Sequence, residues 1–167
     1  EIDLEEDDQQ DKISLCVSDD GKGMEQETLE RVVDPYYTSR KSRNVGLGLP
    51  LLKQNAERTG GSFKITSTPG EGTRVEAHFV KSHLDLPGRG DLKGTVHQII
   101  VANPLRNFVF RYTCNQKGFV IDTREIKDIL EDWPLDHPKI SGYIRELITE
   151  YFSQVGQNQT GSVIKHI

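Results

Sequence analysis

Apolar and polar residues alternate in four short stretches of the first half of the chain, as they do in strands with one buried face. The first two stretches are residues 2–4 and 13–17, and an acidic loop at residues 7–11 lies between them. The other two, residues 62–67 and 73–80, flank the turn sequence Pro69-Gly70-Glu71-Gly72. The pattern therefore predicts two β-hairpins.

Two helices are predicted between these hairpins. Residues 25–33 have the spacing of a short helix that stops at Asp34-Pro35. A second helix begins at residues 47–50, because Pro50 is tolerated in a first turn, and it ends at Gly60-Gly61. Residues 36–46 show no period, so we expect a mobile loop there.

A stretch punctuated by Pro and Gly, residues 83–91, separates these elements from a second set. We expect a helix at residues 92–102 and a hairpin with strands at 108–112 and 119–121, joined by residues 115–118. Helices at about 122–132 and 138–155 follow. Asp122 and Glu125 form a pattern typical of a helix start. The predicted domains are 1–86, an appended α+β region at 87–155 of unknown role, and a flexible tail at 156–167.

Charge and composition exclude several classes of protein. The net charge of −5 argues against a basic nucleic-acid binder. No apolar run approaches the roughly 18 residues of a membrane span. Cys16 and Cys114 are the only cysteines, too few for a disulfide scaffold or a Cys-rich zinc module, so we expect a cytoplasmic protein. The chain has no initiator methionine, and we expect further residues upstream of Glu1.

The sequence Asp19-Asp20-Gly21-Lys22-Gly23-Met24 follows directly after a predicted strand. A carboxylate in this place suits a purine, because it accepts a hydrogen bond from an exocyclic amino group. The glycines allow the backbone to lie close to the ring. Asp-Gly pairs also occur in ordinary turns, which is the alternative interpretation.

A second candidate site is the glycine-rich stretch Val45-Gly46-Leu47-Gly48-Leu49, which opens a predicted helix. The free N–H groups of a helix N-terminus form a cradle for phosphate. Arg40, Lys41 and Arg43 lie just upstream and add positive charge. The alternative is a flexible glycine linker flanked by solvated charges.

Taken together, four motifs in order resemble the GHKL superfamily, most closely the catalytic domain of sensor histidine kinases. Asp19-x-Gly21-x-Gly23 resembles its first glycine box, and Asp34-Pro35-Tyr36-Tyr37 its Phe-rich box. Gly46-Leu47-Gly48-Leu49 resembles the second glycine box, and Gly72-Thr73-Arg74-Val75 the late Gly-Thr strand. The resemblance covers about residues 1–80.

This resemblance implies a two-layer α/β (α+β) sandwich, in which a mixed sheet carries helices on one face and binds ATP. Asp19 would accept the adenine amino group, and Thr73 would support Asp19 through water. Residues 38–46 would form the ATP lid. The residues implied in nucleotide binding are Asp19, Gly21, Gly23, Arg40, Lys41, Gly46, Leu47, Gly48, Leu49 and Thr73.

The sequence also departs from the family pattern. Asn44 stands where the second glycine box usually opens with Gly. The Asn box, which supplies the Mg²⁺-binding Asn of relatives, has no match, and we expect it upstream of Glu1. We therefore assign no metal ligand and no catalytic residue, and expect Mg²⁺ only in the full-length protein. His83 is interpreted as a loop residue rather than a phosphoacceptor.

Three functions follow from these observations. The first is an ATP-binding protein of histidine-kinase type in signal transduction. The second is an ATPase whose nucleotide state drives dimerisation or binding of a protein partner, and the third is a non-catalytic nucleotide-binding module. In each case we expect a nucleotide as ligand, and a protein partner or homodimer is possible. ATP hydrolysis by the 167 residues alone is expected to be slight.

Overall fold

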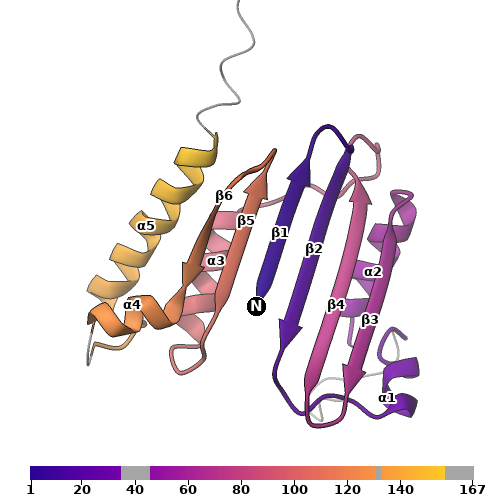
Figure 1. Ribbon diagram of the computed structural model, residues 1–167, viewed down its shortest axis with the longest axis horizontal. Coiled ribbons are helices and arrows are strands. Elements are labelled where there is room, and N and C mark those ends of the chain that lie inside the picture. The colour runs from indigo at the N-terminus through magenta and orange to yellow at the C-terminus, as the bar shows by residue number, and fades with distance from the viewer. Residues whose placement is uncertain (35–45, 131–132, 157–167) are drawn as a thin grey trace, which may run out of the picture. The chain divides into compact units, whose positions relative to one another are not determined.

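The computed structural model describes residues 1–34, 46–130 and 133–156. It divides the chain into two compact units, Glu1–Gly88 and Arg89–Ile167 (Figure 1). The predicted Tyr36-Tyr37 motif, most of the predicted lid and the predicted tail beyond Gly156 lie outside the described residues.

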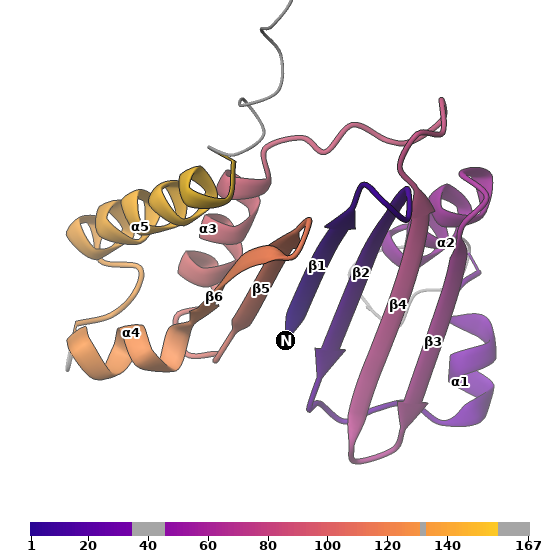
Figure 2. The same cartoon turned by 45° about the horizontal axis from the view of Figure 1, so that its top comes forward.

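The first unit contains a four-stranded antiparallel sheet in the order β3-β4-β2-β1. Its strands are β1 (Ile2–Asp7), β2 (Lys12–Asp19), β3 (Ser62–Thr68) and β4 (Gly72–Val80). Two helices, α1 (Gln26–Arg31) and α2 (Gly48–Arg58), lie on one face of this sheet (Figures 1 and 2). The two-layer sandwich predicted from the sequence is therefore confirmed.

Alternating residues of the strands form the core between the sheet and its helices. Ile13, Val75 and Ala77 are buried on the sheet, and Ala56 of α2 is fully buried. Residues two apart on a strand share a face, so the register of the strands fixes which other side chains point toward the helices. Removing these apolar side chains from water is the main stabilising contribution of this layer.

A charged pair interrupts this apolar layer near the end of β1. Glu6 is opposite Ile13 in the register and only 2% exposed, and its Oε2 lies 3.2 Å from Nζ of Lys81. Lys81 also pairs with Asp8. Burial lowers the pKa of the Lys81 ammonium, but its hydrogen bonds to Asp8 and Glu6 outweigh this and leave the pKa above its ordinary value. The pair thus ties the residue after β4 to the β1–β2 hairpin.

The second unit contains α3 (Leu92–Ala102), β5 (Val109–Cys114), β6 (Lys117–Asp122), α4 (Thr123–Leu130) and α5 (Pro138–Gly156). This order of elements was predicted from the sequence. The hairpin turn is shorter than predicted, because Asn115 and Gln116 both adopt positive φ, 49° and 69°. Such a two-residue turn matches the twist of antiparallel strands, so β6 begins at Lys117 instead of Phe119.

Aromatic side chains fill the core between this hairpin and α5. The ring centroid of Phe152 lies 4.9 Å from that of Phe119 and 5.0 Å from that of Tyr112. Phe110, two residues before Tyr112 on β5, is also buried. A polar contact joins the two longer helices of this unit. His97 of α3 is buried, and its Nε2 lies 3.0 Å from Oγ of Ser141 in α5.

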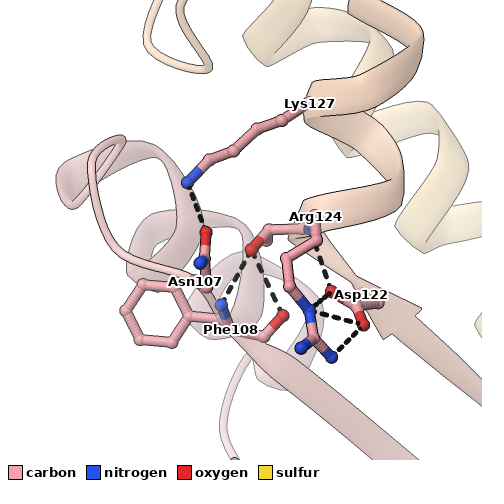
Figure 3. A network of polar contacts seen from close by, with 6 residues as sticks. Asn107, Phe108, Asp122, Arg124 and Lys127 are labelled. Carbon is pink, nitrogen blue, oxygen red and sulfur yellow. Dashed lines mark hydrogen bonds and ion pairs between the residues drawn. The ribbon is translucent and has the colours of Figure 1, made fainter.

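A polar network fixes the start of α4 (Figure 3). Thr123 is fully buried, and its Oγ1 accepts a hydrogen bond of 2.7 Å from the N–H of Phe108. Asp122 accepts the backbone N–H and the guanidinium of Arg124, and these bonds hold the pKa of Asp122 below its ordinary value. Lys127 donates to Oδ1 of Asn107 at 2.9 Å. The helix start predicted at Asp122 is confirmed.

We predict that Lys81→Met lowers the free energy of unfolding by about 3 kcal/mol, because it leaves the buried Glu6 carboxylate without its cation. Adding Glu6→Gln should recover most of the loss. Urea unfolding followed by circular dichroism measures both, with Lys64→Met at an exposed position of β3 as the matched control. A Lys81→Met variant as stable as this control would contradict the assignment.

Candidate functional site

Three polar side chains form a row across the end of the sheet. The register pairs Asp19 of β2 with Thr73 of β4, and Thr73 with Ser67 of β3. Val75, two residues after Thr73, is buried in the core, so Thr73 and its neighbours in the row point to the face that carries the helices. The structure thus brings together Asp19 and Thr73, which the sequence analysis had assigned to one site.

Ser67 joins this row to the loop of residues 20–24, here called the first glycine loop. Its Oγ accepts the N–H of Met24 at 2.9 Å and donates to the carbonyl oxygen of Gly72 at 2.8 Å. The same Oγ lies 3.0 Å from Oγ1 of Thr73. Ser67 belongs to none of the four sequence motifs. Its position in the sequence does carry one signal: Ser67 is a hydroxyl residue in phase with Phe63 and Ile65, so it falls on the core-facing side of an alternating strand.

Two glycines allow the first glycine loop to lie against the β3–β4 turn. Gly23 has φ +62°, and a Cβ there would come within 1.9 Å of the carbonyl oxygen of Thr68. Gly72 has φ +118°, and its Cβ would come within 1.9 Å of the carbonyl oxygen of Asp19. A larger residue at either position would both strain the backbone and push the two segments apart. These glycines are therefore required by the protein's own packing.

Asp19 is exposed at the end of β2 and presents its carboxylate beside this loop. Its Oδ1 accepts the backbone N–H of Gly21 at 2.9 Å. A Cβ on Gly21 would lie 2.5 Å from that oxygen, so glycine leaves room for the carboxylate in this orientation. An ionised carboxylate has several acceptor positions, so Asp19 retains acceptor capacity for a ligand.

The N-terminus of α2 lies at the same end of the sheet. A short connection, residues 59–61, reverses the chain between α2 and β3, and the Gly61 N–H closes it by donating to Ala56. The helix and the strand are therefore antiparallel, and α2 begins near the end at which β3 reaches Ser67 (Figure 1).

Among the residues that the structure describes, no side chain caps this helix start. The N-cap residue is Leu47, and the first helical hydrogen bond runs from the Leu51 N–H to the Leu47 carbonyl oxygen. The N–H groups of Gly48 and Leu49 precede that bond and have no partner within the helix. A Cβ on Gly48 would meet no atom within 4 Å, so the fold itself does not require glycine there. A ligand that approaches this backbone closely would require it.

The remaining residues that the sequence singled out lie outside this row and loop. Arg40 and Lys41 lie outside the described residues. Gly46 and Leu49 are half-buried beside the start of α2. His83 lies in a turn after β4, where its Nδ1 accepts the N–H of Asp85 at 3.1 Å, which agrees with the loop interpretation.

The Mg²⁺ implied by the resemblance does not find a complete set of ligands here. Within residues 1–34, 46–130 and 133–156, no three His, Cys, Asp or Glu side chains are grouped so that they could hold a metal ion. The described residues therefore do not fit a protein-held metal site. In the same ranges, no helix combines the length and the apolar character that crossing a membrane requires.

Comparison with known proteins agrees with this geometry. Residues 1–83 match the family model of histidine kinase-, DNA gyrase B-, and HSP90-like ATPases. Sensor histidine kinase YxdK of Bacillus subtilis (strain 168) is 37% identical over 75 residues, which cover 42% of this chain and 23% of that protein.

Two further relatives match the same part of the chain. Sensor histidine kinase ZraS of Salmonella typhimurium is 37% identical over 62 residues, covering 37% of this chain and 13% of that protein. Sporulation kinase C of Bacillus subtilis is 39% identical over 59 residues, which cover 35% of this chain and 14% of that protein. The matches thus span less than a quarter of these relatives. Residues 1–83 belong to the histidine kinase-, DNA gyrase B- and HSP90-like ATPase family and form an ATP-binding domain of histidine-kinase type.

Proposed function

We propose that this protein binds ATP as part of a signalling protein of histidine-kinase type, with the adenine at Asp19 and the phosphates at the start of α2. The observation that carries the proposal is the meeting of two features at one end of the first unit. One is the polar row of Asp19, Thr73 and Ser67, and the other is the uncapped N-terminus of α2.

In the proposed complex, the Asp19 carboxylate accepts a hydrogen bond from the exocyclic amino group of adenine. Gly21 and Gly23 allow the loop backbone to approach the ring closely, because neither adds a side chain there. Thr73, directly opposite Asp19 in the register, completes the polar wall. The apolar residues of the core lie two positions further along the same strands and supply the surface on which a base can pack.

The phosphates are proposed to lie at the second glycine motif, Gly46-Leu47-Gly48-Leu49. The N–H groups at the start of α2 point outward, and the helix dipole favours an anion at this end. Arg40 and Lys41 are proposed to add positive charge to the phosphates from the lid segment. Mg²⁺ would accompany the nucleotide, with protein ligands from outside the described residues.

The names of the relatives favour phosphotransfer over the other two functions considered. All three are named as kinases, two of them as sensor histidine kinases. We propose accordingly that the phosphoacceptor belongs to a protein partner, a second copy, or another part of the full-length protein. We also propose a cytoplasmic location, because ATP, the proposed ligand, is available there.

We predict that Asp19→Asn weakens the binding of both ATP and adenosine by about 5- to 150-fold, which corresponds to about 1–3 kcal/mol for one hydrogen bond to a charged group. The amide can place a donor against the adenine amino group, whereas the carboxylate cannot. Isothermal titration calorimetry measures the affinities. Asp20→Asn, the adjacent exposed carboxylate, is the matched control. Equal affinities of Asp19→Asn and the wild type would refute the adenine site.

We predict that Gly48→Ala weakens ATP binding about tenfold but leaves adenosine binding unchanged, because the added methyl group stands where the phosphates approach. The fold should be preserved, since the new Cβ meets no protein atom within 4 Å.

Gly142→Ala is the matched control, because it places a methyl group in equally open space on α5. It should leave both affinities unchanged, and thermal denaturation should show both variants folded. A Gly48→Ala variant with wild-type affinity for ATP would refute the phosphate position.

A further inference from the structure

We propose that Ser67 is a positioning residue that fixes the hydrogen-bond polarity of Thr73, and that it thereby makes the site prefer a 6-amino purine to a 6-oxo purine. This inference rests on the proposed adenine site and adds to it a residue outside the four motifs. It follows from the hydrogen bonds that Ser67 makes.

A serine hydroxyl has one proton to donate and two lone pairs to accept with. The carbonyl oxygen of Gly72 can only accept, so the bond of 2.8 Å to it uses the proton of Ser67. The N–H of Met24 can only donate, so it occupies one lone pair at 2.9 Å. Only the second lone pair of Ser67 remains for the contact of 3.0 Å with Thr73.

Thr73 must therefore be the donor in that contact. Its single hydroxyl proton points along the row toward Ser67, away from Asp19 on the opposite side. What Thr73 Oγ1 presents to a ligand is then a lone pair. Asp19, as a carboxylate, also presents only acceptors. The polar wall thus contains two acceptors and no hydroxyl donor.

An acceptor-only wall distinguishes purines by their substituent at position 6. The amino group of adenine donates hydrogen bonds and matches the wall. The carbonyl oxygen of hypoxanthine or guanine is itself an acceptor, so it would face Asp19 and Thr73 without a proton between them. A site whose polar groups are left unpaired by the wrong ligand rejects that ligand strongly. Without Ser67, the Thr73 hydroxyl is free to rotate and donate to a 6-oxo group.

The test compares ATP with inosine triphosphate, which differs at position 6 of the base, by calorimetric titration of the 167-residue chain. Ser67→Ala is expected to lower the ratio of the ATP affinity to the inosine triphosphate affinity about fivefold. This change corresponds to the net free energy of roughly one neutral hydrogen bond. Ser67→Thr keeps the hydroxyl and should restore most of the wild-type ratio. Thr66→Ala, on the opposite face of the same strand, is the control that should leave the ratio unchanged.

A double-mutant cycle separates this role from a merely structural one. Thr73→Val removes the hydroxyl that Ser67 is proposed to orient. In that background Ser67→Ala should leave the ratio unchanged, because no proton remains to redirect. If Ser67→Ala does not fold, Ser67→Cys gives the same comparison with a weak hydrogen-bonding group of similar size.

Two results would overturn the inference. If Ser67→Ala weakens both nucleotides equally, Ser67 only braces the loop at Met24, and the inference fails while the ATP site stands. If the wild-type chain binds ATP and inosine triphosphate with equal affinity, the acceptor-only wall is absent. A wild-type chain that binds neither nucleotide refutes the proposed function itself.

Discussion

The antiparallel register of β2, β4 and β3 is the constraint on which the rest of the site depends. Because the side chains of a strand alternate between its two faces, a shift of one strand by one residue would turn its member of the row, Asp19, Thr73 or Ser67, to the opposite face. The buried residues Ile13 and Val75 hold the register, since the same shift would expose them to water. Core packing and site geometry are therefore fixed by one set of pairings.

The close approaches of the glycine loop add a second requirement. Gly23 and Gly72 let two segments of backbone meet, and the Ser67 hydroxyl then links them through Met24 and the Gly72 carbonyl. The loop that would lie beside the base is thus held by the strand that carries the polar row. Gly48 differs from both, because no atom of the described residues lies within 4 Å of the place its Cβ would take. That contrast separates Gly23 and Gly72, which the packing requires, from Gly48, which is proposed to serve the ligand.

The second unit has a different physical basis. Its hairpin is held to α5 by aromatic rings packed at tilted and edge-on angles. Its chain turns are fixed by side chains that satisfy backbone groups, as Thr123 does for Phe108. Such internal satisfaction of buried polar groups is typical of a stable folded layer. The family match stops at residue 83, before this unit begins. The ATP-binding assignment therefore applies to the first unit.

The sequence by itself determined the order of the elements and the four motifs of the family. Strand alternation and turn glycines are local signals, so they placed β3, β4 and α3 to within a residue or two. Asp19 and Thr73 could be assigned to one site because they belong to motifs.

Only the tertiary structure decided the role of Ser67 and the burial of Glu6. Ser67 acquires its function from contacts with residues 43 positions before it and 6 positions after it, and one serine in a strand does not reveal them. Glu6 stands in an acidic stretch of the sequence, yet the register turns it into the core against Lys81. Both depend on which strands pair and in what register, and pairing between distant segments is set by the packing of the whole layer.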